Sequence, residues 1–350
     1  MLFDLDETQQ AIAQLAGQVL DSTVLDSTVL GSTVLGSTGA DPPEHAWKAL
    51  AQAGLLALAV PEWLGGDGLG VTEIGVLLTE VGRRAVPVPA LATLALGVLP
   101  VARWGSRDQQ RDLLAGVMTG ETVLTAAVRH PPALPAAASG AVTGSAVGVP
   151  YAEQAHRVLV PVTLGTGGTA IALVDPRADG VTLTRTPSSS GSPEYTLRMD
   201  AVRADGFLAG AQAGDLYGYA VAGACAAGDG LLAGALALTA AHTGSREQFG
   251  RPLAAFQAVA QQIADVYVAS RTLHLATLAA CWHMSAPDLA VAAYWLTEEA
   301  PAALRTCHHL HGGIGLDVTY PLHRFSSQVK DLSRLLGGAE HCVERLCSSI

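Results

Sequence analysis

The sequence predicts an α+β protein in which two helical regions flank a region of β-strands along the chain. Over residues 1–120, apolar residues recur at spacings of three and four, the period of amphipathic helices. Over residues 121–209, short apolar runs alternate with Gly, Pro and Ser, a pattern typical of strands and turns. The helical pattern returns over residues 210–350 in long Ala- and Leu-rich segments. We therefore expect three domains with these boundaries, in the order helical, β and helical.

Composition narrows the class of protein further. The 350 residues include 20 basic and 31 acidic ones, which gives a net charge of −11, and 49% of the residues are hydrophobic. This balance is too apolar for a disordered chain and too acidic for a general nucleic-acid binder. The five cysteines are scattered and odd in number, which favours reduced thiols in a cytoplasmic protein.

Neither a signal peptide nor a membrane span is expected. The first seven residues are acidic where a signal peptide needs a basic end. The longest apolar stretch, residues 217–240, is interrupted by Asp229 and is rich in Gly and Ala, which suits a helix packed closely against other helices. We expect this stretch in the protein interior, with Cys225 as a small packing residue.

A short repeat occupies residues 21–38, where a Ser-Thr-Val-Leu unit recurs every five residues. A five-residue period matches neither a helix nor a strand. We expect a surface loop between two helices, because loops tolerate insertions, and we assign the repeat no function.

The most informative motif reads Arg246-Glu-Gln-Phe-Gly-Arg-Pro-Leu-Ala-Ala-Phe-Gln257. Gly250 can end the preceding helix, and Pro252 suits the first turn of the next one. Arg246 and Phe249 would then lie on the connection, and Gln257 on the new helix.

This motif resembles the signature of the acyl-CoA dehydrogenases, Arg-x-x-Phe-Gly-x-Pro-Leu-x-x-Phe-Gln. Two further matches support the resemblance, one in residues 311–324 (His-Gly-Gly-Ile-Gly, then Tyr-Pro-Leu-His-Arg) and one in residues 55–70. The resemblance covers essentially the whole chain. It implies the acyl-CoA dehydrogenase fold, with an N-terminal helical domain, a middle β-barrel-like domain and a C-terminal four-helix bundle. It also implies FAD between the last two domains, reaching across to a neighbouring subunit.

The resemblance assigns cofactor-binding roles to five residues. Arg246 would face the diphosphate of a neighbour's FAD, because a guanidinium matches that group in geometry and charge. Phe249 and Gln257 would line the same end of the cofactor. Gly312 and Gly313 would let the backbone approach the adenosine part closely. The simpler alternative is that Arg246 caps a helix C-terminus and Phe249 belongs to the core.

Both positions at which the family carries its catalytic base lack an acid in this sequence. The reaction needs a carboxylate within reach of the substrate α-proton. Counting from the Tyr-Pro motif, the usual glutamate position is Leu336; counting back from Arg246, the other position is Ala220. Asp215 and Asp229 are out of register. We therefore name no catalytic residue in this chain.

The segments that resemble the flavin-ring half of the site are altered as well. The family's Thr-Glu-Pro-x-x-Gly-Ser-Asp loop aligns with residues 129–136, which hold a run of Pro and Ala. Its Trp-containing segment aligns with residues 148–151, where Pro150 offers neither a hydroxyl nor a backbone N–H. The threonine that follows the usual base is Gly338. One half of the site is retained and the other is lost.

This asymmetry resembles the short, base-lacking subunit of actinobacterial α2β2 acyl-CoA dehydrogenases that degrade steroid side chains. Residues 318–321 and 330–338 strengthen that likeness. The resemblance implies a paralogous partner subunit that supplies the glutamate base and the flavin-ring pocket. It further implies a shared FAD, an acyl-CoA substrate of the steroid side-chain type, an electron-transfer flavoprotein as acceptor, and no activity of this chain alone.

Two other functions remain open at this point. The chain could be a non-catalytic structural or regulatory paralogue that binds a sister enzyme without completing its flavin sites. It could also form a self-sufficient homotetramer with an unusual base, for which Glu340 is the candidate.

The histidines of the chain have simpler interpretations than a metal site. The run Cys307-His308-His309-Leu310-His311 lacks a companion motif with zinc-ligand spacing, so we predict no metal and expect capping or a role at the FAD edge. We expect His274 and His283 to be hydrogen-bonded residues on helices.

Overall fold

A computed structural model describes residues 4–29, 44–129, 133–165 and 167–349. The N-terminal helices are α1 (Glu7–Val29), α2 (Glu44–Gln52), η1 (Glu62–Leu64), α3 (Val71–Arg83), the π-helix η2 (Leu91–Val98), α4 (Leu99–Trp104) and α5 (Arg107–Met118). The strands that follow are β1 (Val123–Ala126), β2 (Ala136–Ala138), β3 (Ala141–Pro150), β4 (Ala155–Leu164), β5 (Thr169–Val174), β6 (Val181–Thr186), β7 (Glu194–Arg203) and β8 (Phe207–Leu208).

The C-terminal region is helical again. It consists of α6 (Ala213–Ser245), the short strands β9 (Glu247–Gln248) and β10 (Arg251–Pro252), η3 (Leu253–Ala255), α7 (Gln257–His283), α8 (Ala286–Tyr294), the π-helix η4 (Trp295–Glu299), α9 (Ala300–His311), η5 (Gly312–Leu316), α10 (Leu322–Leu335) and α11 (Ala339–Ser349). The predicted α+β architecture, with strands between two helical regions, is confirmed.

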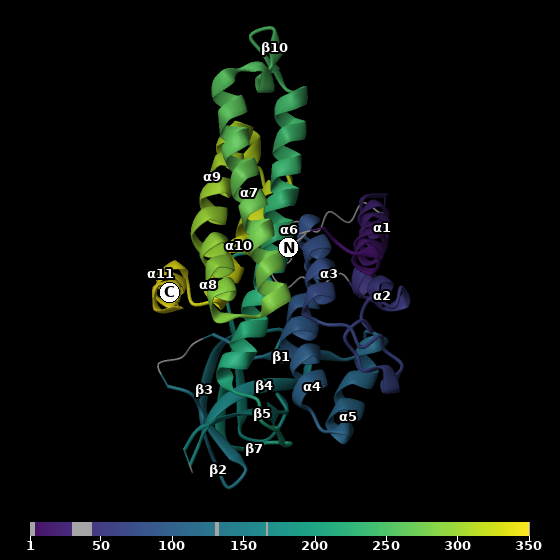
Figure 1. The fold of residues 1–350 in the computed structure, drawn as a ribbon, viewed down its shortest axis with the longest axis vertical. Coiled ribbons are helices and arrows are strands. Elements are labelled where there is room, and N and C mark those ends of the chain that lie inside the picture. Colours follow the sequence, from purple (N-terminus) through teal and green to yellow (C-terminus); the bar gives the residue numbers. More distant parts are fainter. Residues whose placement is uncertain (1–3, 30–43, 130–132, 166, 350) are drawn as a thin grey trace.

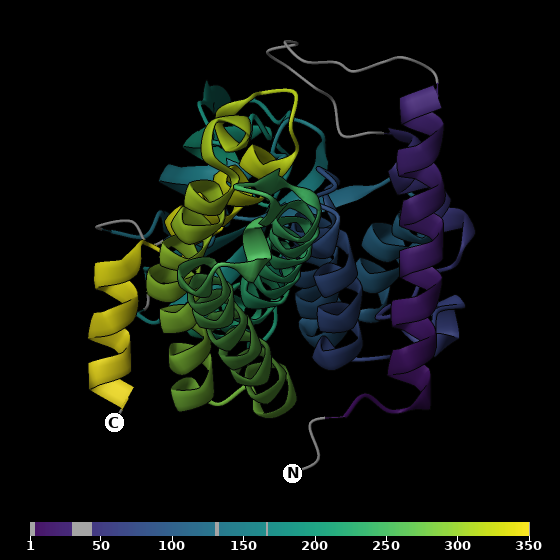
Figure 2. The same cartoon turned by 90° about the horizontal axis from the view of Figure 1, so that it is seen from above.

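The strands form one sheet in the order β6-β7-β3-β2-β4-β5-β8, and β1 pairs with β4 in parallel. Most neighbours are antiparallel; in the β4–β5 pair, for example, Val158 lies opposite Val174 and Thr163 opposite Thr169. Figure 1 shows this sheet at the lower end of the molecule, beside α4 and α5, while α6 and α7 extend away from it and carry the β9–β10 hairpin at their far tip. In Figure 2, α1 and α11 lie on opposite sides of the molecule.

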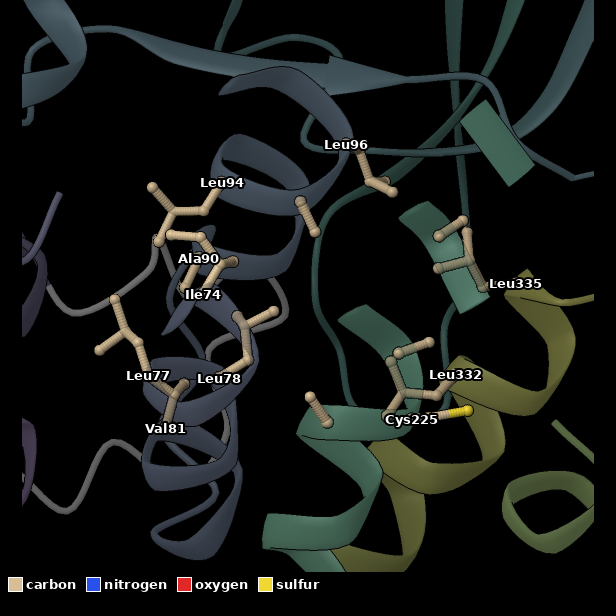
Figure 3. Packing of buried hydrophobic residues seen from close by; sticks show 14 of the residues in the cluster. Ile74, Leu77, Leu78, Val81, Ala90, Leu94, Leu96, Cys225, Leu332 and Leu335 are labelled. Atoms are coloured by element: carbon tan, nitrogen blue, oxygen red, sulfur yellow. The ribbon is translucent and has the colours of Figure 1, made fainter. Parts of the chain in front are cut away.

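Helices α3 and α6 pack so closely that glycine is required between them. A Cβ atom at Gly230 of α6 would lie 1.9 Å from the carbonyl oxygen of Thr79, and one at Gly82 of α3 would lie 2.1 Å from that of Ala227. Leu78 and Cys225 belong to the apolar cluster at this contact (Figure 3). The Gly- and Ala-rich composition of α6 therefore serves packing, as the sequence predicts.

Within the described residues, α6 alone is long and apolar enough to cross a membrane by length and composition. However, 72% of its most apolar window is buried inside the protein, which is what a core helix of a soluble protein shows. Cys225 is fully buried, and this burial raises the pKa of its thiol well above the ordinary value. Both observations agree with an interior helix.

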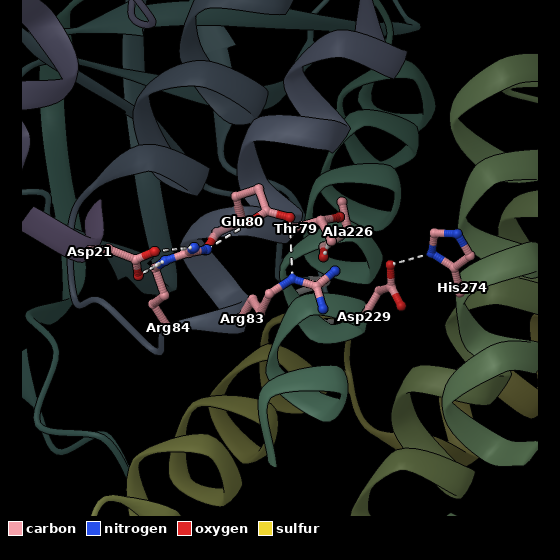
Figure 4. A network of polar contacts seen from close by, with 8 residues as sticks. All are labelled: Asp21, Thr79, Glu80, Arg83, Arg84, Ala226, Asp229 and His274. Carbon is pink, nitrogen blue, oxygen red and sulfur yellow. Dashed lines mark hydrogen bonds and ion pairs between the residues drawn. The ribbon is translucent and has the colours of Figure 1, made fainter. Parts of the chain in front are cut away.

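The prediction that the repeat forms a loop is wrong for its first half. Residues 21–29 continue α1, and residues 30–38 lie outside the part of the chain that the structure describes. Asp21, the first residue of the repeat, accepts two hydrogen bonds from the Arg84 guanidinium at 2.6 and 2.9 Å. Arg84 also donates to Glu80 at 2.6 Å, so this network ties α1 to α3 (Figure 4). The bond to Arg84 lowers the pKa of Asp21.

His274 and His283 are hydrogen-bonded helical residues, as predicted. His274 Nδ1 lies 2.8 Å from the buried Asp229 carboxylate, which links α7 to α6 (Figure 4), and His283 Nδ1 lies 2.8 Å from Asp288. Asp229 therefore serves a structural contact between α6 and α7.

Candidate functional site

The tip of the α6–α7 hairpin carries three of the predicted cofactor-binding residues (Figure 1). Arg246 directly follows α6 and closes it, because its backbone N–H donates to the His242 carbonyl at 2.9 Å. Phe249 and Gly250 form the turn between β9 and β10, with φ angles of 53° and 77°. Two positive φ angles are what a tight two-residue hairpin turn requires. Gln257 is the first residue of α7 and is exposed.

This geometry corrects two details of the sequence-based interpretation. Gly250 does not end the preceding helix, since α6 ends at Ser245 and a hairpin follows. Pro252 lies in β10, before the short helix η3, and α7 begins only at Gln257. A single glycine with a positive φ is typical of a helix end. Here Phe249 also adopts a positive φ, and the two residues together form a hairpin turn.

Phe249 is not a core residue, so that alternative is wrong. Its side chain is 91% exposed, and its one ring contact is an edge-to-face contact with Phe256 at 6.1 Å. A bulky residue with a positive φ is strained, and an exposed aromatic ring gains nothing from burial within this chain. Both features fit a surface that a second molecule completes.

The guanidinium of Arg246 is exposed and makes no ion pair within 4.0 Å among the described residues. Arg251, on the same hairpin, is instead packed 4.1 Å above the Phe256 ring. Arg246 closes α6 with its backbone, as the capping alternative holds, but its side chain stays available. A free guanidinium next to backbone turns can bind a phosphate or diphosphate group.

Gly312 and Gly313 lie at the end of α9, on the same tip of the bundle. Gly312 has a φ of 63° and a ψ of −139°, a conformation that favours glycine. Apart from the adjoining residues, no atom of the described part of the chain lies within 4 Å of a Cβ placed at either position, so neither glycine is needed to make room for a packed neighbour there. Neither a positive φ nor a packed neighbour among the described residues requires glycine at position 313. The absence of a side chain there fits close approach by another molecule.

A contact between two histidines brings this glycine turn next to Arg246. The rings of His242 on α6 and His311 on α9 are stacked, with centroids 4.6 Å apart. All five predicted cofactor residues are exposed. The hairpin that carries Arg246 and Phe249 lies far from the sheet in Figure 1, and the histidine stack joins the end of α9, just before Gly312, to the last turn of α6. The side chains and backbone turns of these residues suit the diphosphate and adenosine end of FAD.

The two base positions lie in the protein interior. Leu336 is 1% exposed and Ala220 is fully buried, and both belong to the main apolar cluster. Tyr217, one turn before Ala220, donates its hydroxyl to the Leu336 carbonyl at 3.0 Å. Burial raises the pKa of Tyr217, so this phenol stays neutral and cannot act as a base. Glu340 is exposed on α11.

The segments aligned with the flavin-ring half of the site line a cavity. Gly148, Pro150 and Tyr151 border it together with the β6–β7 loop and α10. Burial raises the pKa of Tyr151 to about 12, which leaves its phenol neutral. Residues 130–132 of the neighbouring predicted segment lie outside the described residues.

Asp331 fixes the loop that borders this cavity, a function that the sequence analysis missed. Its carboxylate accepts the backbone N–H groups of Ser189 at 2.7 Å and Ser190 at 2.8 Å. Arg334, one turn later on α10, pairs with Glu194 at 2.7 Å. The Lys-Asp-Leu motif at residues 330–332 stands out in the sequence. However, the serine-rich loop that Asp331 binds lies about 140 residues away, so the motif alone does not reveal this contact.

The histidine run before Gly312 is engaged in internal hydrogen bonds. His308 Nδ1 donates to the Gly315 carbonyl at 2.9 Å, and His311 Nδ1 donates to the Cys307 carbonyl at 2.8 Å. The described residues contain no group of three or more His, Cys, Asp or Glu that could hold a metal ion.

A glutamate placed at the lost base position is expected to destabilise the chain without giving it activity. Leu336→Glu buries a charge with no partner, which costs about 3–5 kcal/mol of unfolding free energy. Chemical denaturation measures this loss, and Leu316→Glu is the matched control because Leu316 is 79% exposed. Dehydrogenase activity of the Leu336→Glu chain by itself would show that the ring half of the site is intact.

Comparisons with known proteins agree with this geometry. A family model described as acyl-CoA dehydrogenase, N-terminal domain, matches residues 6–121, and one described as acyl-CoA dehydrogenase, C-terminal domain, matches residues 220–346. The acyl-CoA dehydrogenase FadE28 of Mycobacterium tuberculosis is 46% identical over 99% of this chain and 98% of its own length.

Two solved structures of paired chains are also similar. A variant of the Tcur3481-Tcur3483 steroid ACAD has a TM-score of 0.88 and 33% identity, covering 98% of this chain and 97% of its own. The ChsE4-ChsE5 complex from Mycobacterium tuberculosis has a TM-score of 0.91 and 29% identity, covering 99% of this chain and 98% of its own. Each title names two different components.

Proposed function

The chain belongs to the acyl-CoA dehydrogenase family, and from this premise we propose that it is the base-lacking subunit of a heteromeric, FAD-dependent acyl-CoA dehydrogenase. One observation carries the proposal: the cofactor residues at the bundle tip are exposed, while both positions of the catalytic base are apolar and buried. Leu336 and Ala220 are buried, and the guanidinium of Arg246 is free. Such a chain can contribute residues to the FAD site of a partner subunit, but it has no base at either family position for a catalytic site of its own.

The residues of the tip determine what this chain contributes to the reaction. When bound, FAD would supply the two-electron acceptor for α,β-dehydrogenation of an acyl-CoA. Arg246 would bind its diphosphate, because a guanidinium and a phosphate form charge-assisted hydrogen bonds. Gly312 and Gly313 would let the backbone approach the adenosine part, and Phe249 and Gln257 would line the same end. The glutamate that removes the substrate α-proton, and the pocket around the flavin ring, would come from a paralogous partner subunit.

The substrate, acceptor and location are further parts of the proposal. A steroid side-chain CoA thioester is favoured because one similar paired structure is titled a steroid ACAD. Pairing with an unlike chain is supported by that structure and by the ChsE4-ChsE5 complex. An electron-transfer flavoprotein would accept the electrons, and the assembly would be cytoplasmic.

An activity assay on separate and combined chains tests this function. The chain alone, the dehydrogenase encoded next to it alone, and the two co-expressed are each assayed with a steroid side-chain acyl-CoA and an artificial electron acceptor. We expect turnover only for the co-expressed pair. Turnover by this chain alone would contradict the proposal, and in that case Glu340→Gln would identify the homotetramer with an unusual base. Turnover by the other chain alone, unchanged in the pair, would support the non-catalytic paralogue.

A further inference from the structure

We propose that His242 and His311 are positioning residues of the shared flavin site, and that their stacked, neutral rings hold the Arg246 segment against the Gly312–Gly313 turn. This inference rests on the proposed function and adds to it that the retention of FAD depends on pH. The signature motifs assign no role to His242, and for the histidine run that ends at His311 the sequence led us to expect only capping or a role at the FAD edge.

The pair joins the two segments that would hold the diphosphate and adenosine end. His242 lies one turn before Arg246 on α6, and its carbonyl accepts the Arg246 N–H at 2.9 Å. His311 is the last residue of α9 and directly precedes Gly312. The rings are 4.6 Å apart and inclined by only 18°, which is a stacked arrangement. The stack is therefore a direct contact between the end of α6 and the end of α9.

Two hydrogen bonds hold the His311 ring. Its Nδ1 lies 2.8 Å from the Cys307 carbonyl, which can only accept, so Nδ1 carries a proton. Its Nε2 lies 3.1 Å from the Tyr320 hydroxyl, and in the neutral ring Nε2 accepts the hydroxyl proton. The side chain is 5% exposed, and the Tyr320 ring packs against it at 5.2 Å. The orientation of the His311 ring is therefore fixed, and the His242 ring stacks on it.

The surroundings disfavour a charge on either ring. Burial lowers the pKa of His242, and the charge of Arg246, which directly follows the same helix, lowers it further. Burial also lowers the pKa of His311. The hydrogen bond to the Cys307 carbonyl raises this pKa, but by less than burial lowers it, and the nearby His242 lowers it further. No carboxylate lies within 4.0 Å of either ring among the described residues.

The neighbouring helices bring further groups of the same sign. His308 of α9 has a pKa lowered by burial and, beyond that, by His311, Lys330 and His323, the last two from α10. Protonation of the stacked pair would therefore add positive charge next to Arg246 and next to His308, whose own protonation Lys330 disfavours. The folded pKa values lie below the ordinary 6.5, so the neutral stack stabilises the tip above about pH 6.5 and this contribution is lost as the pH falls.

Retention of FAD by the co-expressed pair of chains tests the proposal. The complex is passed through gel filtration at several values between about pH 5 and pH 8, the range in which histidines titrate, and the visible absorbance of bound flavin is compared with protein. We expect the unchanged complex to lose FAD toward the acid end. His242→Phe keeps a stacked ring without a titrating nitrogen, so this variant should hold FAD at neutral pH and lose less of it in acid. His311→Ala should bind FAD about tenfold more weakly throughout.

The controls separate this inference from the proposed function. His283→Ala changes a histidine that pairs with Asp288 at the other end of α7, and it should follow the unchanged profile. If His242→Phe and His311→Ala also follow that profile while Arg246→Ala loses FAD, the stack has no positioning role and the shared site stands. If Arg246→Ala also retains FAD, the proposed function itself fails. If His311→Ala does not fold, the proposal is tested with His242→Phe and the milder His242→Gln instead. His242 is partly exposed, so its substitution disturbs the fold less.

Discussion

Arg246→Ala is expected to remove most of the FAD from the complex of this chain with its partner subunit. The side chain is exposed, makes no ion pair within the described residues, and lies at the tip that the partner's cofactor would reach. A hydrogen bond to a charged group contributes about 1.5–3 kcal/mol, so the affinity for FAD should fall by roughly 10- to 150-fold. The ratio of bound flavin to protein after gel filtration measures the loss.

Two further variants make this result specific. Arg246→Lys keeps the charge but loses the two-pronged geometry, so it should bind FAD with intermediate affinity. Arg111→Ala is the matched control, because Arg111 is an exposed arginine paired with Asp108 on α5, remote from the tip. Flavin and activity that are unchanged in Arg246→Ala would instead favour a structural or regulatory paralogue.

Gly230→Ala should cause the largest loss of stability among glycine substitutions in α6. Its new Cβ would lie 1.9 Å from the Thr79 carbonyl oxygen and 2.6 Å from the Arg83 nitrogen, both rigid backbone atoms of α3. Helices α3 and α6 must then move apart, and such overpacking costs about 1–3 kcal/mol or more. The midpoint and slope of denaturant unfolding give the change in free energy.

Gly214→Ala provides the matched control for that substitution. Gly214 lies in the first turn of α6, and no atom lies within 4 Å of a Cβ placed there. Alanine is the better helix former by up to about 1 kcal/mol, so this variant should be as stable as the original or slightly more so. Equal destabilisation by both substitutions would contradict the close packing of α3 against α6.

The parts of the fold that local sequence patterns determine could be predicted. The helical and strand regions follow from periodicity, and the burial of α6 follows from its Gly and Ala content. The base positions Leu336 and Ala220 were located by counting from motifs, and the structure places both in the core. In each case the relevant signal is contained in a short stretch of sequence.

The remaining features depend on contacts between distant segments. The helix over residues 21–29 is tied down by Asp21 and Arg84, which are 63 residues apart, and the five-residue period gives no sign of that pair. The loop held by Asp331 is similar, since its serines are typical of an ordinary connection. The stack of His242 on His311 depends on where two helices happen to end. Local patterns cannot supply such pairings.

The number of FAD molecules per assembled chain tests the central claim most directly. Native mass spectrometry of the co-expressed pair, with the flavin measured by absorbance after denaturation, gives this ratio without an activity assay. The shared-site account predicts one FAD for each pair of unlike chains and none for this chain purified alone. One FAD on every chain, or a flavin-containing homotetramer of this chain alone, would contradict it.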